Sequence, residues 1–283
     1  MGDILLLGLN TIWQIATLGF VALGLAIVFG LLRIMNMAHG EFVMIGAYAP
    51  VITTQLGLAP WMQIPVCIIS VGVIALLCER LLIRHFYDRV FDSLLATWGL
   101  SLLLRELVEL TFGRSFQSVV SPLSGTVSFL GISYPSYRLA VLAGLLIFFT
   151  VLTIWYLQSL SATRIRAMVA NQVLAQAAGI NTARLSAIVF VIGCIISGLS
   201  GLILAPLIRV EPFMGLDYLL RCFFILVLGG LGSLKGLEIG SVVIGGLQTI
   251  VGTISDQTGG YLAILLVSIF FLWLRPRGIY SKN

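Results

Sequence analysis

The length of the uncharged apolar runs is the feature that most constrains this chain. The first run, Ile4 to Leu32, has no charged residue, and it exceeds the roughly 20 residues that a helix needs to cross a bilayer. The second, Phe42 to Cys78, is long enough for two such helices, and Gly57 to Pro60 forms a turn between them. Charged residues make up 10% of the 283 residues, against roughly 25% in soluble domains. Lipid must therefore surround most of this chain.

We expect an all-α, polytopic membrane protein with a single transmembrane domain over residues 1–283. The remaining apolar runs predict spans at Leu139–Ser161, Leu185–Ile208, Ile239–Ser255 and Tyr261–Leu274. Two further stretches, Phe91–Phe112 and Leu216–Leu234, contain charged residues. Each is either a tilted span or a broken helix packed inside the protein. The prediction is a bundle of about 8–9 transmembrane helices, some of them short or broken.

The basic residues predict the orientation, because Lys and Arg concentrate in cytoplasmic loops. Placing the loop after the third span in the cytoplasm leaves only Arg114, Arg138 and Arg209 outside. We therefore expect an external N-terminus, a cytoplasmic C-terminus and an external loop over residues 113–136 that forms a short hairpin. The basic residues predicted to be cytoplasmic are Arg33, Arg80, Arg84, Arg89, Arg164, Arg166, Arg184, Lys235, Arg275, Arg277 and Lys282.

The longest internal segment, residues 161–184, is rich in alanine and predicts a helix over Ala167–Gly179, with Gly179 as its end. Flanked by arginines between two spans, this helix has two possible roles. It could dock in a groove of a soluble partner, or it could lie on a surface of anionic lipid.

Polar residues at membrane depth are concentrated in RIMNMAHGEFVMIGAY, Arg33 to Tyr48. Asn36, His39 and Glu41 lie there between two apolar runs, beside Gly40. Such groups usually face a bundle interior or a solute path, since exposing them to lipid is costly. This pattern favours a broken helix whose polar groups line or gate a path. The alternative is a solvated cytoplasmic turn.

A second group, Trp98, Gly99 and Ser101 in LLATWGLSLLL, combines an aromatic face with small and hydroxyl side chains. These residues could contact a small polar solute. Alternatively, they simply allow two helices to pack closely.

Several kinds of site are absent from the sequence pattern. One His and one Glu two residues apart make a poor metal site, and His85 lies in a basic loop. No nucleophile elbow or paired-carboxylate cleft is visible, the net charge of +5 is too small to indicate nucleic-acid binding, and no cofactor or catalytic site is expected. The cysteines, expected to be buried small hydrophobes, are Cys67, Cys78, Cys194 and Cys222.

A series of glycines near the C-terminus predicts close helix packing. Its members are Gly229, Gly230, Gly232, Gly236, Gly240, Gly245 and Gly246. No Gly-Lys-Ser/Thr follows, so this is not a phosphate-binding loop. If ATP drives transport, a partner must hydrolyse it.

The stretch GLAIVFGLLRIMNMAHGEFVMIGAY resembles the signature of bacterial ABC-importer permeases for branched-chain amino acids and urea. The resemblance continues through ERLLIR, LLATWGLSLLL, Ala175–Asn181 and Val227–Gly236. It implies an inner-membrane subunit that works with a second homologous permease, two cytoplasmic ATPases and an external solute-binding protein. The residues that would form the ATPase-coupling helix are Gln172, Gln176, Ala177, Ala178 and Gly179.

Within that family, LLATWGLSL and NMAHGE are more similar to the urea permeases. Urea is therefore the predicted solute, with branched-chain amino acids as the alternative. The residues expected to line or gate the path are Asn36, His39, Glu41, Trp98 and Ser101.

Two hypotheses come from other classes. A stand-alone channel or ion-coupled carrier could use Glu41 or Glu106 as a titratable group at midplane, and it would work without ATPase partners. A membrane scaffold would keep solute uptake when Glu41 or Trp98 is changed.

Overall fold

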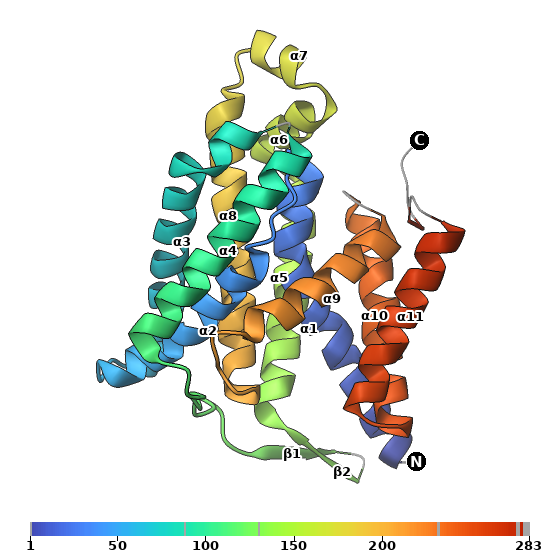
Figure 1. Ribbon diagram of the computed structural model, residues 1–283. Helices are drawn as coiled ribbons and strands as arrows, with labels where there is room; N and C mark the ends of the chain where they lie inside the picture. Colours follow the sequence, from blue (N-terminus) through green and yellow to red (C-terminus); the bar gives the residue numbers. More distant parts are fainter. Residues whose placement is uncertain (1, 88, 130, 231–232, 276–277, 280–283) are drawn as a thin grey trace.

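Long helices follow the apolar runs of the sequence (Figure 1). The computed structural model describes residues 2–87, 89–129, 131–230, 233–275 and 278–279. Within these ranges the helices are α1 (Gly2–Leu32), α2 (His39–Gln55), α3 (Gln63–Leu81), α4 (Val90–Phe112), α5 (Ser136–Gln158), α6 (Leu160–Ala170), α7 (Gln172–Ala177), α8 (Thr182–Leu204), α9 (Met214–Gly229), α10 (Leu234–Ile254) and α11 (Gln257–Leu274). Three short 3-10 helices are η1 (Pro60–Met62), η2 (Ile83–Phe86) and η3 (Ala205–Leu207). Strands β1 (Thr126–Phe129) and β2 (Ile132–Pro135) form one hairpin.

The turn predicted within the second apolar run is confirmed. Helix α2 ends at Gln55, and Gly57 adopts a positive φ of 63° that a glycine tolerates without strain. Pro60 then starts η1, where its missing N–H removes no helical hydrogen bond. Helices α2 and α3 are therefore separate elements.

Six of the described helices are long and apolar enough to cross a membrane, so the chain is polytopic. They are α1, η1 with α3, α5, α8 with η3, α10 and α11. Helices α2 and α9 are shorter, with 17 and 16 residues. Helix α4 is long enough, but Asp92, Arg105, Glu106 and Glu109 interrupt its apolar sequence.

The two ambiguous stretches have different structures. Phe91–Phe112 belongs to the continuous helix α4, and its apolar side chains Leu95, Leu103 and Leu110 are exposed. Leu216–Leu234 instead contains all but the first two residues of the short helix α9, which stops at Gly229. The first is thus an unbroken peripheral helix, and the second is a short helix with a buried face.

Helices α1, α2, α8 and α9 supply most of the buried core. Phe42 on α2 and Phe190 on α8 are fully buried and meet edge to face, with ring centroids 6.3 Å apart. By contrast, α5 exposes Leu146, Ile147 and Val151. Apolar side chains on such outer helices are suited to contact with lipid, where no water has to be ordered around them.

Close backbone contacts position α2. A Cβ added to Gly40 would overlap the carbonyl oxygen of Gly215 on α9, and one added to Gly46 would overlap that of Gly198 on α8. Small residues at such crossings let helix backbones approach closely. The same holds for Gly229 and Gly236 of the predicted glycine series. Gly232 of that series lies outside the described residues, as do Arg277 and Lys282.

The predicted hairpin is confirmed, with Thr126 opposite Pro135 and Phe129 opposite Ile132. Figure 1 shows it at the same end of the bundle as the start of α1. Helices α6 and α7 lie at the opposite end, toward which α11 runs. The two predicted loop regions are therefore on opposite sides of the bundle.

The prediction of one helix over Ala167–Gly179 is wrong. Asn171 is extended, with φ −158° and ψ 106°, and it separates α6 from α7. Its side-chain oxygen accepts a hydrogen bond from Leu174 N at 3.0 Å, as a helix N-cap does. The end of the segment is as predicted, since Gly179 has a positive φ of 82° and follows the C-cap residue of α7, Ala178.

Candidate functional site

The polar stretch found in the sequence forms the junction between α1 and α2. Helix α1 ends at Leu32, and Arg33 has a left-handed φ of 55°. Asn36 is buried in the connection, and its Oδ1 accepts a hydrogen bond from Ala38 N at 3.1 Å. Thr97 on α4 holds the same connection, because Met37 N donates to its Oγ1 at 3.0 Å. The helix is broken here, as expected.

His39 and Glu41 lie in the first turn of α2 and are each only 1% exposed. The alternative of a solvated turn is therefore wrong for these two side chains. His39 Nε2 lies 3.1 Å from the carbonyl oxygen of Val21 on α1, and Nδ1 lies 3.1 Å from Ser197 Oγ on α8. A carbonyl only accepts, so this geometry suits a proton on Nε2. The imidazole thus links three helices.

Glu41 forms an ion pair with α4. Arg105 donates to Glu41 Oε1 at 2.5 Å, and Ser101 Oγ donates to the same oxygen at 2.8 Å. The guanidinium also lies over the ring of Phe213, 5.3 Å from its centroid, just before α9. Since Arg105 is also buried, the pair ties α2, α4 and the start of α9 together. We call His39, Glu41, Ser101, Arg105 and Ser197 the α2 polar cluster.

Trp98 does not join this cluster. It is 49% exposed, whereas its neighbours Thr97 and Ser101 are buried. The buried face of α4 carries the polar contacts, and Trp98 lies on the face that the chain leaves open.

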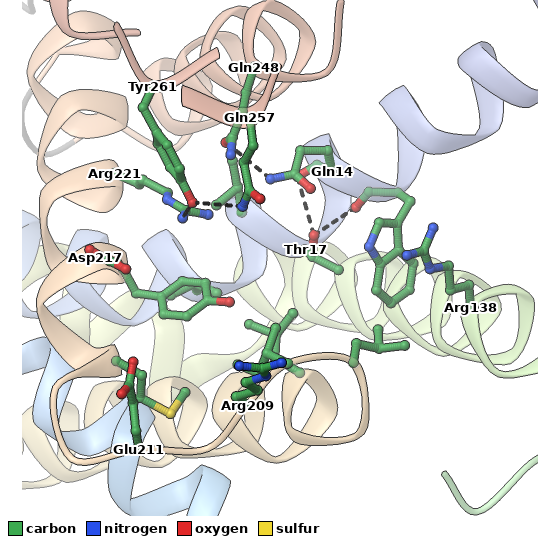
Figure 2. A pocket seen from close by; sticks show the side chains of 18 residues that line it. Gln14, Thr17, Arg138, Arg209, Glu211, Asp217, Arg221, Gln248, Gln257 and Tyr261 are labelled. Carbon is green, nitrogen blue, oxygen red and sulfur yellow. Dashed lines mark hydrogen bonds between the residues drawn. The ribbon is translucent and has the colours of Figure 1, made fainter. Parts of the chain in front are cut away.

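A cavity lies away from the α2 polar cluster, toward the hairpin end. Its volume is about 560 Å³, and we call it the polar chamber (Figure 2). Its walls come from α1, α5, α9, α10, α11 and the connection between α8 and α9. Its polar lining is Gln14, Thr17, Arg138, Arg209, Glu211, Asp217, Arg221, Gln248, Gln257 and Tyr261. None of the five predicted path residues lines it.

Aromatic rings hold the arginines of the chamber. Arg221 lies between the rings of Tyr218 and Tyr261, 5.2 and 4.6 Å from their centroids, and donates a hydrogen bond to Tyr261 Oη. Arg138 lies over Trp13 at 5.7 Å. Cation–π contacts of this kind orient a guanidinium without neutralising its charge.

The sequence contained a weak signal for the chamber. Asp217 and Arg221 are four residues apart, which places them on one face of a helix. They made Leu216–Leu234 ambiguous as a span, although charged groups at membrane depth are by default candidates for a solute path. The other members come from distant parts of the chain, so only the fold brings them together.

The five residues predicted to couple to an ATPase are exposed at the other end of the bundle. Gln172 and Gln176 belong to α7, and Gly179 follows it. The apolar side chains of Val173 and Leu174 are 74% and 66% exposed there. Gln176 Nε2 donates to Thr182 Oγ1 at 2.8 Å, which fastens α7 to the start of α8. The four cysteines are buried and free, as expected.

Comparison with known proteins gives a consistent result. A family described as "Branched-chain amino acid transport system / permease component" matches residues 7–274. The chain is 26% identical to the high-affinity branched-chain amino acid transport system permease protein LivH of Salmonella typhimurium, over 94% of this chain and 92% of that protein. Identity to the protein BraD of Pseudomonas aeruginosa is also 26%, with the same coverage.

One solved structure has a related fold. PsaBC from Streptococcus pneumoniae, in complex with Fab, matches with a TM-score of 0.50. The match covers 96% of this chain and 92% of the solved chain, at 14% identity. At that identity the similarity concerns the fold alone.

Proposed function

Because the chain belongs to the family of branched-chain amino acid transport permeases, we propose that it imports amino acids of this class as one subunit of an ATP-driven importer. It is a transport permease rather than an enzyme. The observation that carries the proposal is the family match over nearly the whole chain. The sequence-based preference for urea has no support from the relatives, whose names refer to branched-chain amino acids, so the alternative solute is adopted.

The proposed assembly contains a second homologous permease, two cytoplasmic ATPases and an external solute-binding protein. In a bacterial cell it would lie in the inner membrane. Helix α7 supports the ATPase part of this proposal, because it exposes Val173 and Leu174 at one end of the bundle. An apolar helix face of this kind suits a groove in a soluble partner, and the docking role is therefore preferred to the lipid-surface role.

The proposed topology has nine crossings. Adding α2, α4 and α9 to the six long apolar helices gives this number. An odd number places the two ends of the chain on opposite sides, in agreement with the opposite positions of the start of α1 and the end of α11 in Figure 1. The excess of basic residues near α6 and α7 favours a cytoplasmic C-terminus and an external hairpin.

We also propose that Asn36, His39, Glu41 and Ser101 gate transport by holding α2 against α1, α4 and α8. The hydrogen bonds of His39, Glu41 and Ser101 cross these helices, and that of Asn36 fixes the connection from α1 to α2, so movement of α2 must break or shift them. Trp98 would line a solute path only if α4 borders the second permease.

Reconstitution in proteoliposomes tests this function. The complete importer, supplied with its binding protein, should accumulate leucine only when ATP is present. Omitting the ATPase subunits should abolish uptake, and uptake that persists without them would instead establish a channel or ion-coupled carrier.

A variant of α7 tests the docking helix in the same assay. Leu174→Asp should lower ATP-driven uptake at least about tenfold, because one buried charge without a partner costs several kcal/mol at an interface. Leu174→Met keeps an apolar side chain and is the matched control. Normal uptake by Leu174→Asp would exclude α7 as the ATPase-docking helix.

A further inference from the structure

The polar chamber contains groups of both charge signs beside an aliphatic wall. Its arginines are Arg138, Arg209 and Arg221, and its carboxylates are Glu211 and Asp217 (Figure 2). The aliphatic lining comes from Leu18, Val21, Leu204, Leu207, Ile208 and Met214. A volume of about 560 Å³ is in the range of small-molecule sites. Such a lining suits a solute that is charged at one end and aliphatic at the other.

The guanidinium groups have no carboxylate partner among the described residues. Arg221 is held by two tyrosine rings and the Tyr261 hydroxyl, and its Nε is buried without a hydrogen-bond partner in the described part of the chain. Arg209 lies over the ring of Phe116, 5.5 Å from its centroid. Aromatic rings thus orient Arg209 and Arg221, and no carboxylate among the described residues neutralises either charge.

The carboxylates are equally free. Glu211 follows Arg209 by two residues in the connection between α8 and α9, and Asp217 precedes Arg221 by one helical turn. Neither carboxylate forms an ion pair or a side-chain hydrogen bond with any residue that the structure describes. Glu211 and Arg221 are half-buried, whereas Arg209 and Asp217 are exposed. An unpaired charge is costly where it is partly removed from water, and a ligand that supplies the opposite charge offsets that cost at Glu211 and Arg221.

We propose that the polar chamber binds an aliphatic amino acid as its zwitterion, which deepens the proposed function and rests on it. The solute carboxylate faces Arg221 and Arg209, where guanidinium donors match its two oxygens. The solute ammonium faces Glu211 and Asp217. The aliphatic side chain packs on the apolar wall formed by α1 and the end of α8. Urea, which has no charge, would leave all four groups unpaired.

Equilibrium binding tests the assignment without the binding protein. The complete importer in nanodiscs is incubated with tritiated leucine, and unlabelled leucine, leucinamide or 4-methylpentanoate is added as competitor. Leucinamide lacks the carboxylate, and 4-methylpentanoate lacks the ammonium group. Each should compete at least about tenfold more weakly than leucine, since hydrogen bonds to charged groups contribute most among polar contacts.

Two variants test the positive and the negative groups of the chamber separately. Arg221→Gln should weaken the binding of leucine and 4-methylpentanoate about tenfold and leave leucinamide unchanged. Glu211→Gln, at a side chain with no ion pair or side-chain hydrogen bond to lose among the described residues, should weaken leucine and leucinamide and leave 4-methylpentanoate unchanged. Arg114→Gln is the control, because Arg114 pairs with Glu109 outside the chamber. A merely structural role would weaken all three ligands alike, and that result would overturn the assignment.

ATP-driven uptake measured on the same preparations distinguishes failure of the chamber assignment from failure of the proposed function. Normal leucine uptake, with no bound tritiated leucine that unlabelled leucine displaces, would overturn the chamber assignment and leave the proposed function intact. A wild-type importer that accumulates urea but no amino acid would overturn both.

Discussion

Gln117 and Val210 exchange two backbone hydrogen bonds across the hairpin end of the bundle. Gln117 N donates to Val210 O at 2.9 Å, and Val210 N donates to Gln117 O at 3.0 Å. Val210 lies between Arg209 and Glu211, so this bridge fastens the segment before the hairpin to two charged residues of the polar chamber. A displacement of the segment around Gln117 would therefore move the backbone beside Arg209 and Glu211.

The first prediction concerns this bridge. Gln117→Pro removes the backbone donor and should lower uptake driven by the loaded binding protein about threefold to tenfold, because a hydrogen bond contributes about 0.5–1.5 kcal/mol. ATP hydrolysis without the binding protein should be unchanged. Gln117→Ala keeps the backbone N–H and serves as the control. Equal uptake by both variants would show that the bridge does not couple the two regions.

The second prediction concerns the buried ion pair between Glu41 and Arg105. Arg105→Met should destabilise the protein by about 3–5 kcal/mol, because it leaves the Glu41 charge buried without its partner. Replacing both, Glu41→Leu with Arg105→Met, should recover most of that loss. Thermal unfolding of the purified protein in detergent measures both effects as a change in Tm.

An exposed ion pair provides the control for this measurement. Arg89 and Asp92 are 3.8 Å apart and largely exposed, so Arg89→Gln should change stability by less than about 1 kcal/mol. If Arg105→Met is no more harmful than Arg89→Gln, the contact with Glu41 does not hold α2 to α4.

The third prediction compares two glycines. Gly40→Ala should prevent folding or lower Tm strongly, because its Cβ would overlap the backbone of Gly215 and backbone cannot move aside as a side chain can. A Cβ added to Gly99 on α4 would have no neighbour within 4 Å. Gly99→Ala should therefore stabilise the helix by up to about 1 kcal/mol. Expression level and Tm measure both. Similar values for the two variants would contradict the close crossing of α2 and α9.

The sequence was sufficient for the apolar helices, because a bilayer sets their length and composition. It also located the break before His39, since polar residues are costly within a span. It could not reveal the pairing of Glu41 with Arg105 or the convergence of Arg138, Arg209 and Arg221, because these depend on which helices become neighbours. The preference for urea came from a few residues of α2, α4 and the connection before α2, none of which lines the chamber.

The prediction of one helix over Ala167–Gly179 failed for a different reason, because Asn171 interrupts it through a contact within the same segment. Its side chain caps α7 at Leu174 N, and capping favours a new helix start over continuation of α6. The alanine-rich flanks favoured one long helix, and this propensity outweighed the single asparagine in the sequence-based prediction.

The fourth prediction concerns the N-cap of α7. Asn171→Ala removes the cap, which is worth about 1 kcal/mol, and substitutes the residue with the highest helix propensity. Helices α6 and α7 should then tend to fuse, and the altered position of Leu174 should lower ATP-driven leucine uptake about fivefold. Asn171→Asp keeps an N-cap acceptor and should transport normally. The spacing between spin labels on α6 and α7 reports the change directly. An unaltered spacing together with normal uptake by Asn171→Ala would show that the break between α6 and α7 does not depend on this cap.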